Sequence, residues 1–420
     1  MLKKAPYIAA LLLSAAPLFA QGKRLWILQS TGEMVEYDLT NFAPKQRAKL
    51  PTEAAKSPAA ISVNRLGQML FASPVSLPLS DSDIANPRKI WVWNGHAALS
   101  IDQPLEHKEE AHGSNQAISE SAPIPYLVAD GNHLLWFANE ARRLEREGVD
   151  LSTTNTFQAW QTDLEGKGRE EVASSRLPDC RCPTGSCEES CPTFMVWAPT
   201  AGIDSFFLTT QFVAGQTSTT YKASTRYQQE GGKWNPTTLA DPLQRVLDAN
   251  SNGTAIVVAI PDTGCCGWSN QSNDQTLLIA EGKTRTLFDE QATYKNADYD
   301  VSFYTANARL SPDSQTIAMT IVATAQSNKP IQLSEQGQAN PEESQRIRKA
   351  LLDVPSVELE TADDTLHRVA LLPHAVLIGW INDKELLILE NHLLVAYNVG
   401  SAARRKSTIH VEDSSRVFLR

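Results

Sequence analysis

One pattern of polar and apolar positions recurs along most of the chain: a short polar turn followed by an alternating apolar run. The turn contains Asn, Asp or Gly, and the run alternates as a strand with one buried face does. The six copies lie at residues 64–71, 130–137, 201–208, 252–258, 313–319 and 382–388. A turn that repeatedly reverses the chain into a half-buried strand builds a series of small antiparallel sheets.

The repeated runs predict strands at about 24–29, 68–73, 133–138, 204–209, 254–260, 315–321 and 385–390. In two places a second alternating run follows at once. The stretch 385–398 contains two runs joined at 390–392, and 24–38 contains two runs joined by a turn at Thr31 and Gly32. Counting the N-terminal copy gives seven units with little helix. We therefore expect an all-β fold, a seven-bladed β-propeller, with six or eight blades as the alternatives.

The N-terminal unit lacks a first strand, because almost nothing precedes Arg24 once the leader described below is removed. A closed propeller fills such a vacancy with a strand from the other end of the chain, which leaves no exposed sheet edge. The strand-like segment 415–420 is the candidate for this strand. A frayed C-terminal tail is the alternative.

The copies are about fifty to seventy residues apart. This spacing is longer than the ~40–50 residues of a compact blade, so insertions must separate the strands. Within a single domain over 21–420, we expect loop or helix insertions at about 75–88, 103–122, 138–150, 178–193 and 326–360. The charged stretch 138–148 is interpreted as a turn of surface helix. Residues 340–353 predict a short helix, with Asn340 as its N-cap and Pro341 in its first turn.

One copy of the pattern is specific enough to name a family. The phrase Ala308-Arg-Leu-Ser-Pro-Asp-Ser-Gln-Thr-Ile-Ala318 resembles the Ser-Pro-Asp-Gly-x-x-Ile-Ala phrase of the WD40-like propeller repeats of the TolB family. Ser314 stands where the family usually has Gly, and 379–387 is similar to a second, weaker copy. The resemblance implies a propeller and, for many relatives, a periplasmic or secreted binding role. It brings no catalytic residue to this chain.

Residues 1–20 are typical of a secretory signal peptide. Lys3 and Lys4 give a positive start, 8–13 are apolar, and cleavage is expected after Ala20. A buried N-terminal helix is the alternative. We therefore expect a periplasmic or secreted protein. No later run reaches the ~18 apolar residues that a membrane-spanning helix needs, so no membrane span is expected.

Charge narrows the range of partners. The formal net charge is −10, and it becomes about −12 when the two lysines of the leader are removed. Nucleic acids and anionic lipid surfaces both require a basic patch. The short basic run 404–406 is interpreted as a solvated turn. We therefore expect a protein partner or an extracytoplasmic ligand, no nucleic acid, and a monomeric chain.

All six cysteines fall in two short segments, which hold Cys180, Cys182, Cys187 and Cys191, and the adjacent Cys265 and Cys266. An even number of cysteines behind an export signal predicts disulfides, so we expect no free thiols and at least two bridges within 180–191. A four-thiolate metal site is the alternative for the first segment, although an oxidising compartment opposes it. The adjacent pair either closes on itself or bonds to the first segment.

The loop at 262–275 is the candidate recognition surface. Trp268 directly follows the glycine-flanked cysteine pair, which would hold the loop stiff. The polar side chains that follow it are Asn270, Gln271, Asn273 and Asp274. A rigid aromatic ring beside fixed hydrogen-bonding groups suits carbohydrate or peptide recognition. An ordinary polar loop is the alternative.

Enzyme motifs are missing from the sequence. There is no Gly-x-Ser-x-Gly elbow, and the eight histidines show no metal-binding spacing. The densest group of possible metal ligands is Glu106, His107, Glu109, Glu110 and His112. We interpret it as solvated charge in a loop, with a metal site as the alternative. We expect a binding or scaffold protein for a protein partner, polymer or small ligand, with no catalytic residue, cofactor or metal. The alternative is a propeller hydrolase or lyase with a dispersed active site.

Overall fold

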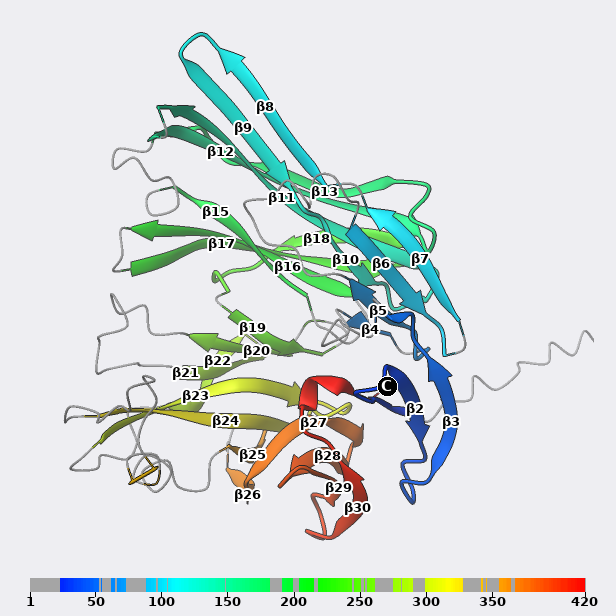
Figure 1. Ribbon diagram of the computed structural model, residues 1–420. Coiled ribbons are helices and arrows are strands. Elements are labelled where there is room, and N and C mark those ends of the chain that lie inside the picture. Colours follow the sequence, from blue (N-terminus) through cyan, green and yellow to red (C-terminus); the bar gives the residue numbers. More distant parts are fainter. Residues whose placement is uncertain are drawn as a thin grey trace, which may run out of the picture.

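The computed structural model contains a chain built from antiparallel β-strands (Figure 1). It describes residues 23–419 apart from 53, 55–61, 65, 73–87, 96, 104, 148, 182–190, 199–203, 215–217, 244, 251–252, 254, 261–274, 281, 290–298, 328–340, 343–344, 346–354 and 364–366. Within these residues the strands pair into seven sheets. The architecture is an all-β propeller, as the repeated turn-and-strand pattern predicts.

Six of the sheets have four strands each. The first contains β31 (Val417–Leu419), β1 (Leu25–Leu28), β2 (Glu33–Tyr37) and β3 (Pro44–Lys49). The second contains β4 (Ser62–Val63), β5 (Met69–Ala72), β6 (Arg88–Trp93) and β7 (Ala98–Gln103). The fourth contains β15 (Thr193–Trp197), β16 (Ser205–Ala214), β17 (Ser218–Glu230) and β18 (Lys233–Thr238).

The remaining four-stranded sheets follow in chain order. The fifth contains β19 (Arg245–Ala249), β20 (Ala255–Ile260), β21 (Gln275–Ala280) and β22 (Lys283–Asp289). The sixth contains β23 (Tyr299–Leu310), β24 (Thr316–Ser327), β25 (Ser356–Thr361) and β26 (Arg368–Pro373). The seventh contains β27 (Ala375–Asn382), β28 (Glu385–Glu390), β29 (Leu393–Asn398) and β30 (Arg404–His410).

The third sheet is larger than the others. Its strands are β8 (Glu106–His112), β9 (Asn115–Ser121), β10 (Ile124–Leu127), β11 (His133–Arg146), β12 (Val149–Asp163), β13 (Glu170–Arg176) and β14 (Cys180–Arg181). The beginning of β11 pairs with β10 and its end pairs with β9. Figure 1 shows the β8–β9 hairpin reaching beyond the other sheets.

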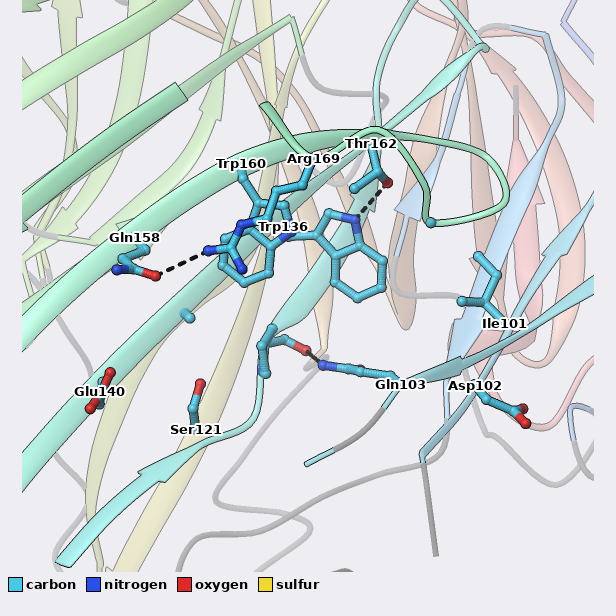
Figure 2. Close-up of a pocket in the computed structure, with 13 residues that line it drawn as sticks. Ile101, Asp102, Gln103, Ser121, Trp136, Glu140, Gln158, Trp160, Thr162 and Arg169 are labelled. Atoms are coloured by element: carbon cyan, nitrogen blue, oxygen red, sulfur yellow. Dashed lines mark hydrogen bonds between the residues drawn. The ribbon is translucent and has the colours of Figure 1, made fainter. Parts of the chain in front are cut away.

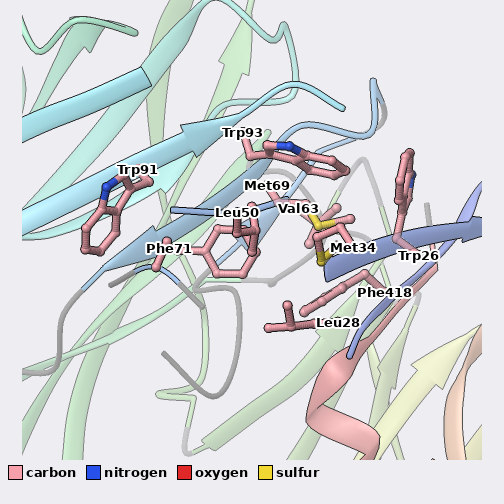
Figure 3. Close-up of a cluster of buried hydrophobic side chains, with 11 residues drawn as sticks. Trp26, Leu28, Met34, Leu50, Val63, Met69, Phe71, Trp91, Trp93 and Phe418 are labelled. Atoms are coloured by element: carbon pink, nitrogen blue, oxygen red, sulfur yellow. The ribbon is translucent and has the colours of Figure 1, made fainter. Parts of the chain in front are cut away.

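A hydrophobic cluster fills the space between each pair of neighbouring sheets. Between the first and second sheets, Trp26, Met34, Trp93 and Phe418 pack together (Figure 3), and the rings of Trp26 and Trp93 meet edge to face. Similar clusters follow from sheet to sheet, and the last joins the seventh sheet to the first. Each sheet is therefore buried on both faces by its neighbours, as in a propeller.

The C-terminal strand closes the first sheet. β31 pairs with β1 antiparallel, so that Leu25 lies opposite Leu419 and Ile27 lies opposite Val417. The prediction that the C-terminal segment fills the place of the missing strand is confirmed, and the frayed-tail alternative is wrong. Phe418 points into the cluster with the second sheet, and Leu419 into the cluster with the seventh.

All seven predicted strand positions are confirmed by β1, β5, β11, β16, β20, β24 and β28. The turns ahead of these strands explain the recurring polar residues. Asn64 accepts hydrogen bonds from the backbone N–H groups of Leu66 and Gln68 through its side-chain oxygen, and Gly67 then takes a φ of 77°. The Asn side chain thus substitutes for a backbone partner, and glycine supplies the left-handed conformation.

Two of the expected insertions have a different structure. The stretch 138–150, interpreted as helical, contains the end of β11 and the start of β12. The stretch 103–122, interpreted as a loop, contains the β8–β9 hairpin. Both predictions failed because these strands continue beyond the hydrophobic core and are polar there. Charged pairs between strands, such as Arg142 with Glu110, take the place of the alternating apolar residues by which a strand is normally recognised.

The other insertions lie largely outside the described residues. This holds for 75–88, for most of 178–193, and for 326–360 between the end of β24 and the start of β25. The predicted helix at 340–353 falls in the last of these: residues 341, 342 and 345 are described and are helical, and the remainder stays a prediction.

Candidate ligand-binding groove

Most residues of the sequence-predicted site lie outside the described part of the chain. The loop at 261–274 contains Cys265, Cys266, Trp268, Asn270, Gln271, Asn273 and Asp274, and the segment 182–190 contains Cys182 and Cys187. Cys180 and Cys191 are described, and they form a disulfide bond with each other. A bond between these sulfurs is incompatible with both serving as thiolate ligands of a metal ion.

A groove of about 310 Å³ lies between the second and third sheets. One wall comes from the end of β7, the other from β11 and β12, and the rim from the chain between β9 and β10 and the turn after β12 (Figure 2). The residues that line it are Ile101, Asp102, Gln103, Ser121, Pro123, Trp136, Ala138, Glu140, Gln158, Trp160, Thr162, Gly166 and Arg169. Its volume is at the lower end of the ~300–1,000 Å³ of small-molecule sites.

The groove exists because the pairing along β11 is interrupted. Phe137 is the last residue paired with β10, and pairing with β9 begins again at Ala141. Pro123 lies in this break, and a proline has no N–H with which to continue a ladder. Between Ala138 and Glu140, β11 therefore pairs with β12 along one edge and has no strand pairing along the other.

Two tryptophans form the apolar floor of the groove. Strand register places Trp136 directly opposite Trp160, and their rings are parallel within 3° with centroids 6.2 Å apart. Figure 2 shows the two indoles side by side. The indole N–H of Trp136 donates to the Thr162 hydroxyl at 2.9 Å, which fixes the ring. Trp136 is buried, and both rings belong to the hydrophobic cluster between the second and third sheets.

Arg169 lies over this floor. Its guanidinium carbon is 4.0 Å from the centre of the Trp160 ring, and one of its N–H groups donates to the Gln158 side-chain oxygen at 3.2 Å. A guanidinium over an indole gains from cation–π attraction and can still donate hydrogen bonds. Arg169 is exposed, and it forms no ion pair with the described part of the chain.

Gln103 contributes a buried hydrogen-bond acceptor to the groove. Its side-chain N–H group donates to the Pro123 carbonyl at 2.7 Å, and the same carbonyl accepts from Arg88 at 3.2 Å. Only 5% of Gln103 is exposed, and its side-chain oxygen has no partner among the described residues. A buried acceptor without a partner costs about 1–3 kcal/mol.

Two carboxylates line the groove, and both have partners. Asp102 forms an ion pair with Lys89 across β6 and β7. Glu140 accepts a hydrogen bond from the Ser119 hydroxyl of β9. Lys89 offsets the negative charge of Asp102, whereas the Ser119 hydroxyl stabilises the charge of Glu140 without offsetting it.

A smaller pocket of about 80 Å³ continues along β11. It shares Glu140 with the groove and is otherwise lined by Lys108, Glu110, Ala117, Ser119 and Arg142. Trp136, Ala138, Glu140 and Arg142 alternate along β11 and therefore point to the same face. With a rise of ~3.3 Å per residue, this row is about 20 Å long.

The possible metal ligands that the sequence places in β8 lie on two opposite faces of the strand. His107 and Glu109 share one face and contact each other at 2.8 Å, whereas Glu110 points to the other face and pairs with Arg142. In the described part of the chain, no group of three or more His, Cys, Asp or Glu side chains has an arrangement suited to a metal ion. Among the same residues, no helix is long and apolar enough to cross a membrane.

The residues of the groove were missed by the sequence reasoning. Trp136 is visible in the second copy of the repeat, and Trp160 lies in an alternating stretch, but nothing in their spacing shows that they face each other. Their contact follows from the register of β11 with β12. The helical interpretation of 138–148 also concealed the length of β11.

Comparisons with known proteins extend only to the fold. No family model matches the chain, and no curated protein matches it. Among solved structures, similarity is found to prolyl oligopeptidase B from Galerina marginata, with 8% identity, a TM-score of 0.43, and coverage of 94% of this chain but 52% of that one. Dihydro-heme d1 dehydrogenase NirN gives 10% identity, a TM-score of 0.36, and coverage of 92% and 73%. TolB from Acinetobacter baumannii gives 11% identity, a TM-score of 0.26, and coverage of 84% and 80%. At such values the fold assignment rests on the strand pairing of this chain itself.

Proposed function

We propose that this chain is an exported binding protein that holds a small ligand or a segment of a polymer in the groove between its second and third sheets. The observation that carries the proposal is the floor of Trp136 and Trp160 with the Arg169 guanidinium over it, in a groove between two sheets. A ligand with an apolar part and a hydrogen-bond acceptor contacts both at once.

The proposal includes the architecture and the compartment. Each of the seven sheets is taken as one blade of a seven-bladed propeller, related to the WD40-like repeats of the TolB family through the phrase at 308–318. The signal-like segment 1–20 and the Cys180–Cys191 bond support a periplasmic or secreted location, since disulfides persist in oxidising compartments. The loop at 262–275 remains a further candidate for contact with a partner.

A blocked-groove experiment tests the proposal. The Ser121→Trp variant places a bulky side chain at the rim, and Thr238→Trp places the same side chain on an exposed position of β18 that is not among the groove residues. Mono- to tetrasaccharides and short peptides are titrated against each protein, and calorimetry measures the binding. We expect at least one compound to bind the wild type and Thr238→Trp but not Ser121→Trp. Unchanged binding to Ser121→Trp, or no binding by any compound, contradicts the proposal.

A hydrolase or lyase is the second candidate, because two carboxylates, Asp102 and Glu140, line the same groove. Paired carboxylates carry out acid–base chemistry on glycosidic bonds. In this structure each has a partner in the chain, which favours holding a ligand over reacting with it. Chromatography of the saccharides after prolonged incubation separates the two functions, since only an enzyme yields shorter products.

A further inference from the structure

The guanidinium of Arg169 indicates which chemical class of ligand suits the groove. The Trp160 ring supports one face of the guanidinium and Gln158 holds one N–H, so the group is fixed before any ligand arrives. The remaining N–H groups lie at the edge of the plane, where a carboxylate can bind two of them at once. Prior fixation lowers the entropy lost on binding.

The carboxylates of the groove do not neutralise this cation. Asp102 is paired with Lys89, Glu140 is hydrogen-bonded to Ser119, and neither contacts Arg169. Arg169 therefore contributes a positive charge whose only polar contact in the described chain is to a neutral amide. A ligand with a negative charge at this end of the groove can pair with Arg169.

We propose that the groove binds an acidic glycan, a sugar chain that carries carboxylates. The inference rests on the proposed binding function and specifies its ligand. A sugar ring lies beside the partly exposed Trp160, its hydroxyls face the polar lining residues Ser121 and Gln158, and a carboxylate pairs with Arg169. The row of residues along β11 leads on to the second pocket, which is lined by Lys108 and by Arg142 paired with Glu110. A site of this length suits a chain of sugars better than a single small molecule.

The test uses tetragalacturonate and the same oligosaccharide with its carboxyl groups methyl-esterified. The two probes share the sugar and its hydroxyls and differ in charge. Calorimetric titrations are made on the wild type and on Arg169→Gln, with Arg176→Gln as the control, because Arg176 is an exposed arginine of β13 that is not among the groove residues. Pentaglutamate serves as an acidic probe without sugar hydroxyls.

We expect tetragalacturonate to bind the wild type and Arg176→Gln alike, and to bind Arg169→Gln at least tenfold more weakly. The esterified probe should bind all three proteins weakly. Equal binding of both saccharides, with no effect of Arg169→Gln, overturns the acidic glycan but leaves a binding groove in place. Failure of tetragalacturonate to bind overturns it too, and binding of pentaglutamate alone points to an acidic peptide instead. Failure of the proposed function is recognised separately, by the Ser121→Trp experiment.

Discussion

At the scale of single residues, Ser314 occupies a backbone position that other copies of the repeat give to glycine. Its φ is 58°, and its N–H donates to the Ser311 carbonyl at 2.8 Å. Gly67 and Gly253 make the corresponding turns with φ of 77° and 63°. The left-handed conformation costs a residue with a side chain about 1–2 kcal/mol, whereas glycine adopts it freely.

Ser314→Gly should therefore raise the free energy of unfolding by about 0.5–1 kcal/mol, because the relief of strain exceeds the extra entropy that glycine gives the unfolded chain. The reverse change, Gly67→Ser, should lower it by a similar amount. A Cβ at Gly67 has room, with its nearest neighbour the Arg24 Cδ at 3.8 Å, so the strain alone acts. Urea unfolding midpoints at an unchanged slope measure both effects. A destabilised Ser314→Gly protein would show that the serine side chain has a structural role.

Glu360 is a second residue with a measurable effect, this time on pH dependence. It is buried on β25 beside Glu358, which forms an ion pair with Arg368, and one carboxylate oxygen of Glu360 has no partner among the described residues. Burial, helped by the negative charge of Glu358 and opposed by Arg368, raises the pKa of Glu360 to about 7. The folded protein therefore binds this proton more tightly than the unfolded chain, whose pKa is near 4.5.

It follows that Glu360 makes stability decline as the pH rises from about 4.5 to 7, and that the loss persists above that range. Glu360→Gln should remove this decline and melt at a higher temperature than the wild type at pH 8, with little difference at pH 4.5. Glu170→Gln, a change at an exposed position, is the control. Melting curves across the pH range provide the test, and parallel profiles for the wild type and Glu360→Gln would disprove the role of this carboxyl.

At the scale of elements, the sequence predicts best the strands that alternate cleanly. β1, β28 and β29 are visible because their apolar residues face two neighbouring sheets and their turns contain Gly or Asn. The ends of β11 and β12 are not visible, because outside the ring they pair mostly polar residues with one another. The groove could not be predicted for a related reason: it depends on strand register and on a break opposite β11, which leave no local signature.

The short strand β31 is the element whose loss should matter most for its size. Phe418 is 7% exposed and packs against Phe71 in the cluster of the first and second sheets. Phe418→Ala should lower the free energy of unfolding by about 3–5 kcal/mol, as expected for a large core side chain. Arg416→Ala, just before the strand, should cost less than about 1 kcal/mol. Denaturant unfolding measures the free energy of unfolding of both variants. An equal loss in the two would mean that the packing of β31 does not stabilise the closed propeller.

At the scale of the whole molecule, the groove and the hydrophobic core between the blades have side chains in common. Trp136 and Trp160 form the floor of the groove and also belong to the cluster that joins the second and third sheets. A ligand on this floor excludes water from the edge of that cluster. Binding should therefore raise the melting temperature, in proportion to the logarithm of ligand concentration above the dissociation constant.

The meeting of β1 and β31 in one sheet has a consequence for how the protein is made. During synthesis the first sheet emerges early, but its inner place stays vacant until residues 417–419 leave the ribosome. Throughout that interval β1 presents an unpaired edge, which is the kind of surface that associates with other chains. The newborn polypeptide thus depends on residues 417–419 to protect residues 25–27, and a translation arrest before residue 417 leaves the propeller open.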